Sequence, residues 1–227
     1  MKVAVRKPVK PKAPSHRHAA ALIKAGYPLV AGIDEVGRGC WAGPVVAAAV
    51  ILRPGTRKLV GVNDSKLLTH ARRLQMARLI KQHALAVGIG WVHSADIDAN
   101  GLTWAVRQSG LRALDHMQHP YHAVLLDGNH NYLREHCYSQ TIIKGDQLSI
   151  SIAAASIVAK VARDQYMELQ HRLYPDYDFA SNKGYGTPRH AEAVRQTLTP
   201  LHRRLFKPVQ LASQGFFEQL SFDHVID

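Results

Sequence analysis

Cysteine is nearly absent from this 227-residue chain, which contains only Cys40 and Cys137. Two cysteines without ligand-like spacing exclude a disulfide framework and a cysteine-ligated zinc site, and they favour a reducing, cytoplasmic setting. Long hydrophobic runs are also absent, so no segment is apolar for long enough to span a membrane. Hydrophobic residues nevertheless make up 46% of the chain. This content is sufficient for an ordinary buried core, and we expect one large domain.

Acidic residues are scarce relative to basic ones, with 17 Asp and Glu against 29 Lys and Arg, a net charge of +12. Such an excess predicts a polyanionic partner, nucleic acid first and an anionic membrane surface second. Residues 1–30 contain basic side chains and four prolines but no acid. We therefore predict a disordered basic arm over residues 1–18, a catalytic domain over 19–209 and a tail over 210–227. An organelle transit peptide remains an alternative, which the prolines disfavour.

Hydrophobic periodicity predicts strands that alternate with helices along the domain. We expect strands before and after residues 31–44, and further strands over 85–92, 123–126 and 141–143. Helices are expected over 19–24, 69–82, 102–117, 150–173 and from 188 to about 198, and residues 199–209 are expected to be irregular. Three leading strands followed by helices alternating with strands predict an α/β fold, a mixed sheet with helices packed around it.

Four carboxylates lie at or just beyond the ends of apolar segments: Asp34, Glu35, Asp127 and Asp146. Strand ends from distant parts of a sequence meet at one edge of a sheet, and Mg²⁺ and Mn²⁺ prefer such oxygen-rich sites. Asp34 and Glu35 are neighbours, so in a regular strand they point to opposite faces. We expect both to serve one site only if the strand ends or kinks there, or if Glu35 offers its carbonyl oxygen. Asp34 is therefore the stronger candidate.

Gly37-Arg38-Gly39 follows these acids, and its glycines allow backbone N–H groups to approach a phosphate closely. A second acidic pair, Asp96 and Asp98, precedes a helix and is better explained as a helix cap. The acids and the glycine loop together indicate a phosphodiester-cutting site that uses two divalent ions.

Several motifs, in this order, resemble those of ribonuclease HII of the bacterial type. They are Ala-Gly-Ile-Asp-Glu-Val-Gly-Arg-Gly (31–39), Asn-Asp-Ser-Lys (63–66), Leu-Asp-Gly-Asn (126–129), Lys-Gly-Asp (144–146), Ala-Ala-Ser-Ile-Val-Ala-Lys (154–160), Arg-Asp (163–164), Lys-Gly-Tyr-Gly-Thr (183–187) and His-Arg-Arg (202–204). Each motif alone is weak, but the ordered set is specific. The resemblance covers about residues 29–209 and implies an RNase H-like fold with a C-terminal helical extension from about residue 187.

The resemblance also implies an activity and a set of site residues. It implies Mg²⁺- or Mn²⁺-dependent cleavage of the RNA strand of RNA–DNA hybrids, and cleavage 5′ of ribonucleotides embedded in duplex DNA, leaving 3′-hydroxyl and 5′-phosphate ends by a monomeric enzyme. The four carboxylates would be catalytic and metal-binding. The residues expected to contact the substrate are Gly37, Arg38, Gly39, Ser65, Lys66, Lys183 and Tyr185.

Several residues keep two interpretations. His190 either contacts substrate or is a buried structural histidine, and we favour the structural role. Ser156 and Lys160 either contact phosphate or pack in the fold, and Asp164 is expected to stabilise its helix. The Arg203-Arg204 pair is either a solvated loop or part of a track for DNA.

Two departures from the family pattern are mild. Cys40 stands where proline is common, and Leu67 stands where a second lysine often follows. Two other functions remain open: a nucleic-acid-binding protein with an inactive site, and another RNase H-like nuclease. Finally, Gln219-Leu-Ser-Phe222 resembles a shortened form of the peptide by which bacterial proteins dock to the replication sliding clamp, although a frayed amphipathic end is the simpler interpretation.

Overall fold

The computed structural model describes residues 13–53, 56, 59, 61–62, 65 and 68–222, with side chains to residue 214. Its centre is a five-stranded sheet in the order β3-β2-β1-β4-β5. The strands are β1 (Val30–Val36), β2 (Val45–Leu52), β3 (Ala84–Val92), β4 (Ala123–Asp127) and β5 (Ser139–Ile142). β1, β2 and β3 pair antiparallel, whereas β4 and β5 continue parallel to β1. The predicted mixed α/β sheet is confirmed.

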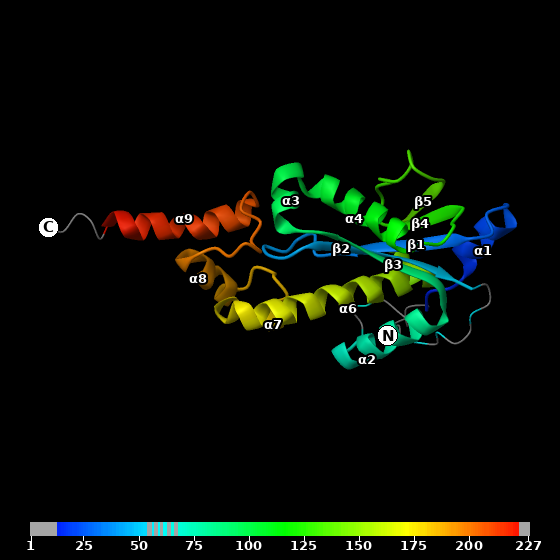
Figure 1. Cartoon of the computed structure of the whole chain (residues 1–227), viewed down its shortest axis with the longest axis horizontal. Coiled ribbons are helices and arrows are strands. Elements are labelled where there is room, and N and C mark those ends of the chain that lie inside the picture. The colour runs from blue at the N-terminus through cyan, green and yellow to red at the C-terminus, as the bar shows by residue number, and fades with distance from the viewer. Residues whose placement is uncertain are drawn as a thin grey trace, which may run out of the picture.

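Helices cover both faces of this sheet (Figure 1). They are α1 (Arg17–Lys24), α2 (His70–His83), α3 (Ser94–Asn100), α4 (Leu102–His116), α5 (Gly145–Leu148), α6 (Ile150–Leu173), α7 (Phe179–Asn182), α8 (Pro188–Gln196) and α9 (Lys207–Phe222), with a 3₁₀ turn at Pro175–Tyr177. None of the helices in these described parts is long and apolar enough to cross a membrane.

The apolar runs of β1 and β2 supply a core on each face of the sheet. Ala48 and Val50 pack with α2 and α6 on one face. Ile33 and Ala49 pack with α4 on the other face. Helix α6 crosses β1 at Gly32, where a Cβ atom would lie 2.3 Å from the backbone of Ser151. This close crossing fixes the helix beside the strand that carries the first two acids.

The ends of the domain differ from the expectations. Helix α1 begins at Arg17, so the last two residues of the predicted arm are helical. Helix α9 covers the end of the segment expected to be irregular and most of the predicted tail. Its first turns are held by Val209, which is fully buried, and α9 leads away from the sheet (Figure 1). Among the side chains described in α9, only Val209 is buried, and one buried residue is a weak periodic signal, which explains why the pattern missed this helix.

Candidate active site

β1 carries Asp34 and Glu35 past the point where its neighbour β4 ends. Its pairing with β4 stops at Ile33, but its pairing with β2 continues to Val36. The strand therefore does not break at the two acids, which the sequence suggested as one way for both to serve a single site. Instead, one edge of β1 is open beside them. The N–H of Glu35 donates a hydrogen bond of 2.8 Å to Oδ1 of Asp34.

Asp127 and Asp146 reach the same edge from β4 and α5. Asp127 is the last residue of β4, and its Oδ1 accepts a 2.7 Å hydrogen bond from the N–H of Gly145. Lys144 adopts a left-handed conformation that turns the chain into α5, and Asp146 follows with 5% of its surface exposed. This backbone hydrogen bond holds the segment that carries Asp146 beside Asp127.

Burial and the neighbouring acids raise the pKa values of Asp34 and Glu35. Burial raises the pKa of the Asp34 carboxyl well above its ordinary value, and the charges of Glu35, Asp127 and Asp146 add to this effect. A hydrogen bond with Ser156 on α6 opposes it. Burial also raises the pKa of Glu35, against the effect of Arg38, whose guanidinium lies 3.1 Å from Oε1 of Glu35. The charges of Glu35, Asp127 and Asp146 therefore all act on Asp34.

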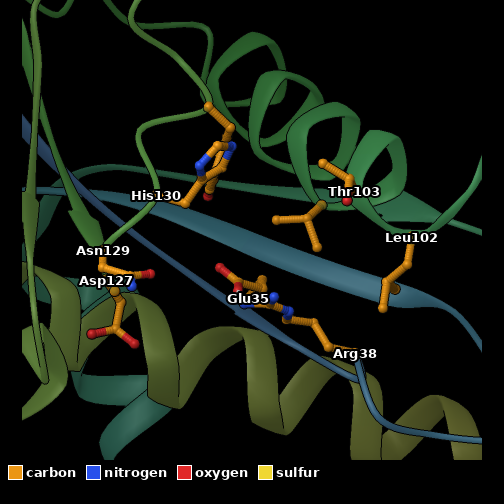
Figure 2. A pocket seen from close by; sticks show the side chains of 10 residues that line it. Glu35, Arg38, Leu102, Thr103, Asp127, Asn129 and His130 are labelled. Carbon is orange, nitrogen blue, oxygen red and sulfur yellow. Dashed lines mark hydrogen bonds and ion pairs between the residues drawn. The ribbon is translucent and has the colours of Figure 1, made fainter.

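A pocket of about 280 Å³ opens beside this group, between β1, the end of β4 and α4. Figure 2 shows Glu35, Arg38 and Asp127 on one side and Leu102 and Thr103 on the other. The pocket walls also include residues that the sequence analysis had not assigned to the site: Thr103, Asn129, His130 and Tyr132. Asn129 is the last residue of the Asp127 motif and His130 directly follows it, and that proximity was the available signal. Burial and the charge of Glu35 raise the pKa of Tyr132 well above its ordinary value.

The residues of this edge fit a hard divalent cation. Their donors are carboxylate oxygens, which Mg²⁺ and Mn²⁺ prefer. Burial and the neighbouring acids raise the pKa values of Asp34 and Glu35, so their charged forms are unfavourable there without a cation. Within the described part of the chain, no three acids, histidines or cysteines lie close enough together to enclose an ion. The carboxylates are therefore gathered at one edge but remain apart.

Gly37-Arg38-Gly39 leaves β1 as a tight loop whose carbonyl groups are held by Arg203. Gly37 has φ +94°, a conformation that side chains disfavour. The guanidinium of Arg203 donates to the carbonyl oxygens of Gly37, Arg38 and Gly43 at 2.6, 2.7 and 2.9 Å. Arg203 is fully buried, so both of its predicted roles, a solvated loop and a DNA track, are wrong for this residue. Arg204 is exposed.

The Lys183–Thr187 loop packs directly against the segment that follows this turn. The carbonyl of Gly184 accepts hydrogen bonds from the N–H groups of Trp41 and Ala42. A Cβ atom at Gly184 would lie 2.3 Å from the carbonyl oxygen of Ala42. Tyr185, 44% exposed, faces Gly39, whose ideal Cβ position lies 4.0 Å from the tyrosine ring. The structure thus brings together Gly39 and Tyr185, as the sequence analysis required.

A second buried arginine connects the two loops. Arg163 on α6 donates to the carbonyl groups of Ala42, Pro44 and Lys183 at 3.1, 2.9 and 2.7 Å. It is fully buried, and each of its nitrogen atoms has a partner. The Arg-Asp motif had drawn attention to Asp164, which forms an ion pair with Lys160 at 2.8 Å. The structural contribution of Arg163 itself was missed.

Three residues expected to contact the substrate remain to be placed: Lys183, Ser65 and Lys66. The ammonium group of Lys183 is bound by Glu168 at 2.7 Å, so its side chain is already paired. Ser65 is buried and shares a 3.0 Å hydrogen bond with Ser156, which links it to Asp34. Lys66 lies outside the described residues.

Comparison with known proteins agrees with this geometry. The family model described as Ribonuclease HII matches residues 31–209. The chain belongs to the ribonuclease HII family. It is 47% identical to the ribonuclease HII of Chloroflexus aurantiacus over 194 residues, which cover 83% of this chain and 91% of that protein. It is 46% identical to that of Geobacillus kaustophilus over 197 residues, 86% of this chain and 74% of that one.

Solved structures agree as well. The ribonuclease H2 of Pyrococcus horikoshii matches with a TM-score of 0.74 at 23% identity, covering 84% of this chain and 99% of that chain. A complex of PCNA with the RNase HII of Archaeoglobus fulgidus matches at 0.67 and 26% identity, covering 78% and 95%. The RNase HIII called Bst, in complex with Mn²⁺, matches at 0.67 and 19% identity, covering 84% and 70%. The RNase H2-like fold is thereby confirmed.

Family membership settles the enzyme class. The chain is a type 2 ribonuclease H, a metal-dependent hydrolase that acts on RNA in RNA–DNA hybrids. An inactive nucleic-acid-binding protein and an unrelated RNase H-like nuclease are no longer needed as alternatives.

Proposed function

We propose that this ribonuclease HII also cleaves on the 5′ side of single ribonucleotides embedded in duplex DNA. The observation that carries the proposal is the position of Arg38. It lines the pocket with Glu35 and Asp127 and directly precedes Gly39, which faces Tyr185. The carboxylates and the two loops expected to recognise a ribose, residues 37–39 and 183–187, are therefore adjacent parts of one surface.

Asp34, Glu35, Asp127 and Asp146 are the proposed ligands of two Mg²⁺ or Mn²⁺ ions. When bound, such ions activate a water molecule and stabilise the leaving oxygen of a phosphodiester. In this hydrolysis the oxygen of a water molecule would bond to phosphorus as the bond from phosphorus to the 3′-oxygen breaks; the water would lose a proton, and the 3′-oxygen would take one up. The products are a 3′-hydroxyl and a 5′-phosphate. The protein's own contribution is to hold four carboxylates at one sheet edge, with α4 closing the opposite wall.

The two loops would select the nucleotide. Only the 2′-hydroxyl distinguishes RNA from DNA at a given position. Gly37 and Gly39 have no side chains that would keep backbone groups away from that hydroxyl, and Arg38 can bind the adjacent phosphate. The half-exposed ring of Tyr185 can lie against the following sugar, where an additional 2′-hydroxyl would crowd it. This arrangement favours a junction at which RNA is followed by DNA.

The test uses two labelled substrates of identical sequence, a duplex DNA with one ribonucleotide and a continuous RNA–DNA hybrid. We expect Mg²⁺- or Mn²⁺-dependent cleavage of both, with the first cut 5′ of the ribonucleotide and with a 5′-phosphate on the ribonucleotide product. Cleavage of the hybrid alone would contradict the proposal. A DNA duplex without ribonucleotides is the control and should remain intact.

We further propose that the chain docks to the replication sliding clamp through residues 219–222. This segment is the last turn of α9, which extends away from the sheet (Figure 1), and one matching structure is a complex of an RNase HII with PCNA. A pull-down with the clamp should retain the full chain and lose a truncation after Gly215. Equal retention of the two proteins would refute docking through this segment.

A further inference from the structure

His190 and His202 lie side by side beneath the Tyr185 loop, in the part of the fold between α6, α8 and α9. Their exposed fractions are 0% and 2%, and Nε2 of one lies 3.0 Å from Nε2 of the other. Tyr177 and Phe179 pack around both rings. A pair of histidines sealed in an aromatic cluster is costly unless every ring nitrogen has a defined partner.

The neighbouring groups define the proton positions in this pair. The N–H of Thr199 donates to Nδ1 of His202 at 2.9 Å, so that nitrogen carries no proton and Nε2 carries it. Nε2 of His202 therefore donates to Nε2 of His190. His190 must then carry its proton on Nδ1, which lies 2.8 Å from the carbonyl oxygen of Tyr185. The result is one directional chain of hydrogen bonds from Thr199 to Tyr185.

Both histidines are neutral in this chain. Burial lowers the pKa of His190, and burial together with His190 lowers the pKa of His202 to about 3. A second proton on either ring would place two N–H groups face to face or against the Thr199 N–H. Since each neutral ring has one donor and one acceptor, neither can reorient without losing a hydrogen bond.

The chain ends at the residue that faces Gly39. The carbonyl oxygen of Tyr185 accepts from Nδ1 of His190 and from the N–H of Thr187 at 3.0 Å. The next residue after His202 is Arg203, which holds the carbonyl groups of Gly37 and Arg38. One short segment therefore anchors both loops, the first through an arginine and the second through the histidine pair.

We propose that His190 and His202 are positioning residues that fix Tyr185 against Gly39 and thereby set the preference for an embedded ribonucleotide. The inference rests on the proposed function, because it assigns the specificity of that same site to residues that do not touch the substrate. The proposed role differs from a packing role in one respect. The essential feature is the proton that His190 donates to the Tyr185 carbonyl, not the volume of the imidazole.

Two substitutions separate these roles. In His190→Asn the amide nitrogen lies near the former Nδ1 and can still donate to the Tyr185 carbonyl. In His190→Gln the polar end lies near the former Nε2, so the contact with His202 survives but the donor to Tyr185 is lost. Val194→Ala is the matched control, because Val194 lies on the same helix in the same cluster. It reduces packing without touching the hydrogen-bond chain.

The experiment measures kcat/KM for the full chain on the single-ribonucleotide duplex and on the continuous hybrid, together with urea unfolding. We expect the ratio of the two values to fall about tenfold in His190→Gln, the loss of about one hydrogen bond. The ratio should stay within about threefold of the wild type in His190→Asn and in Val194→Ala, although all three variants lose stability. Equal ratios in His190→Gln and His190→Asn would overturn the proposal.

A second measurement does not depend on activity. Imidazole ¹⁵N shifts of the wild-type chain should show the Nδ1–H tautomer for His190 and the Nε2–H tautomer for His202. Any other assignment overturns the proposal even if the enzyme cleaves both substrates. Conversely, a wild-type enzyme that ignores embedded ribonucleotides refutes the proposed function. The role of the hydrogen-bond chain would then be judged by whether His190→Gln, but not His190→Asn, shifts the ring resonances of Tyr185.

Discussion

Replacing Arg203 by alanine tests the most connected side chain of the site. Arg203 is fully buried, and it satisfies three carbonyl groups, those of Gly37, Arg38 and Gly43. Burial lowers the pKa of its guanidinium to about 10, so it remains charged at neutral pH. The substitution removes every one of these donors at once and leaves a cavity in place of the side chain.

The expected loss of stability follows from these contacts. Each buried carbonyl that loses its donor costs about 1–1.5 kcal/mol, so three of them give about 3–5 kcal/mol. Arg203→Lys keeps the charge but cannot form the planar fork, and we expect about half of that loss. Arg204→Ala is the control, because it removes the same charge from an exposed neighbour and should change stability by less than about 0.5 kcal/mol.

Urea unfolding at pH 7, analysed by linear extrapolation, measures all three variants. Activity on the single-ribonucleotide duplex should fall further in Arg203→Ala than in Arg204→Ala, because only the first releases the Gly37 and Arg38 carbonyl groups. If Arg203→Ala destabilises the chain by less than about 1 kcal/mol, the carbonyl groups do not depend on this arginine and the reasoning fails.

The remaining predictions concern the acids, the ions, the tyrosine and the histidine pair. Asp127→Asn should lower kcat more than about 100-fold with unchanged circular dichroism; near-normal Mg²⁺-dependent cleavage would remove Asp127 from the site. Mg²⁺ or Mn²⁺ at a hundred times its Kd should stabilise the wild type by about 2.7 kcal/mol. Asp34→Asn should abolish that gain yet be more stable than wild type without metal, because burial raises the pKa of Asp34 and so penalises its charged form at neutral pH; an unchanged metal response would count against this assignment. Tyr185→Ala should lose more activity on a single embedded ribonucleotide than on a continuous hybrid, and Tyr185→Phe should retain most of it; equal losses would show that the ring does not recognise the junction. The lowered pKa of His202, about 3 against an ordinary 6.5, means that the unfolded chain binds the additional proton in this interval. Stability should therefore fall as pH falls from about 6.5 to 3, by up to about 1.4 kcal/mol per pH unit from this residue, and His202→Gln should show a shallower decline.

The elements predicted from periodicity are those with a continuous apolar stripe or run. Helix α6 has the predicted bounds, Ile150–Leu173, because alanine and branched residues continue along it until Pro175. The strands β1 and β2 were recognisable from their apolar runs. Helix α9 was missed, because Val209 alone is buried among the side chains of α9 that the structure describes. The order of strands in the sheet also lay beyond periodicity, because parallel pairing of β4 with β1 depends on contacts between distant segments.

The acids proposed for the site stand out in the sequence for a different reason. A carboxylate at the end of an apolar strand conflicts with the local pattern, and such conflicts indicate function. Asp34 and Asp127 are conflicts of this kind. Arg163 and Arg203 gave no comparable signal, because a basic residue in a polar segment is ordinary when it is exposed. Their burial depends on three carbonyl groups from another part of the chain, and no property of residues 160–165 or 199–209 indicates those partners.

The two halves of the site therefore have opposite electrostatic requirements. At the sheet edge, burial and the neighbouring acids raise the pKa values of Asp34 and Glu35, so the charged forms in this half are unfavourable for folding. Around the loops, two buried guanidinium groups are satisfied by backbone carbonyl groups, so this half is complete without substrate. An enzyme that must distinguish one hydroxyl needs rigid loops before the substrate arrives, because a loop ordered only on binding would accept either sugar. The carboxylates can remain apart, because the divalent ions that we propose as their partners would draw them together. Rigidity at the loops and unbalanced charge at the sheet edge are consequently two requirements of the same reaction, and the chain meets them with different residues.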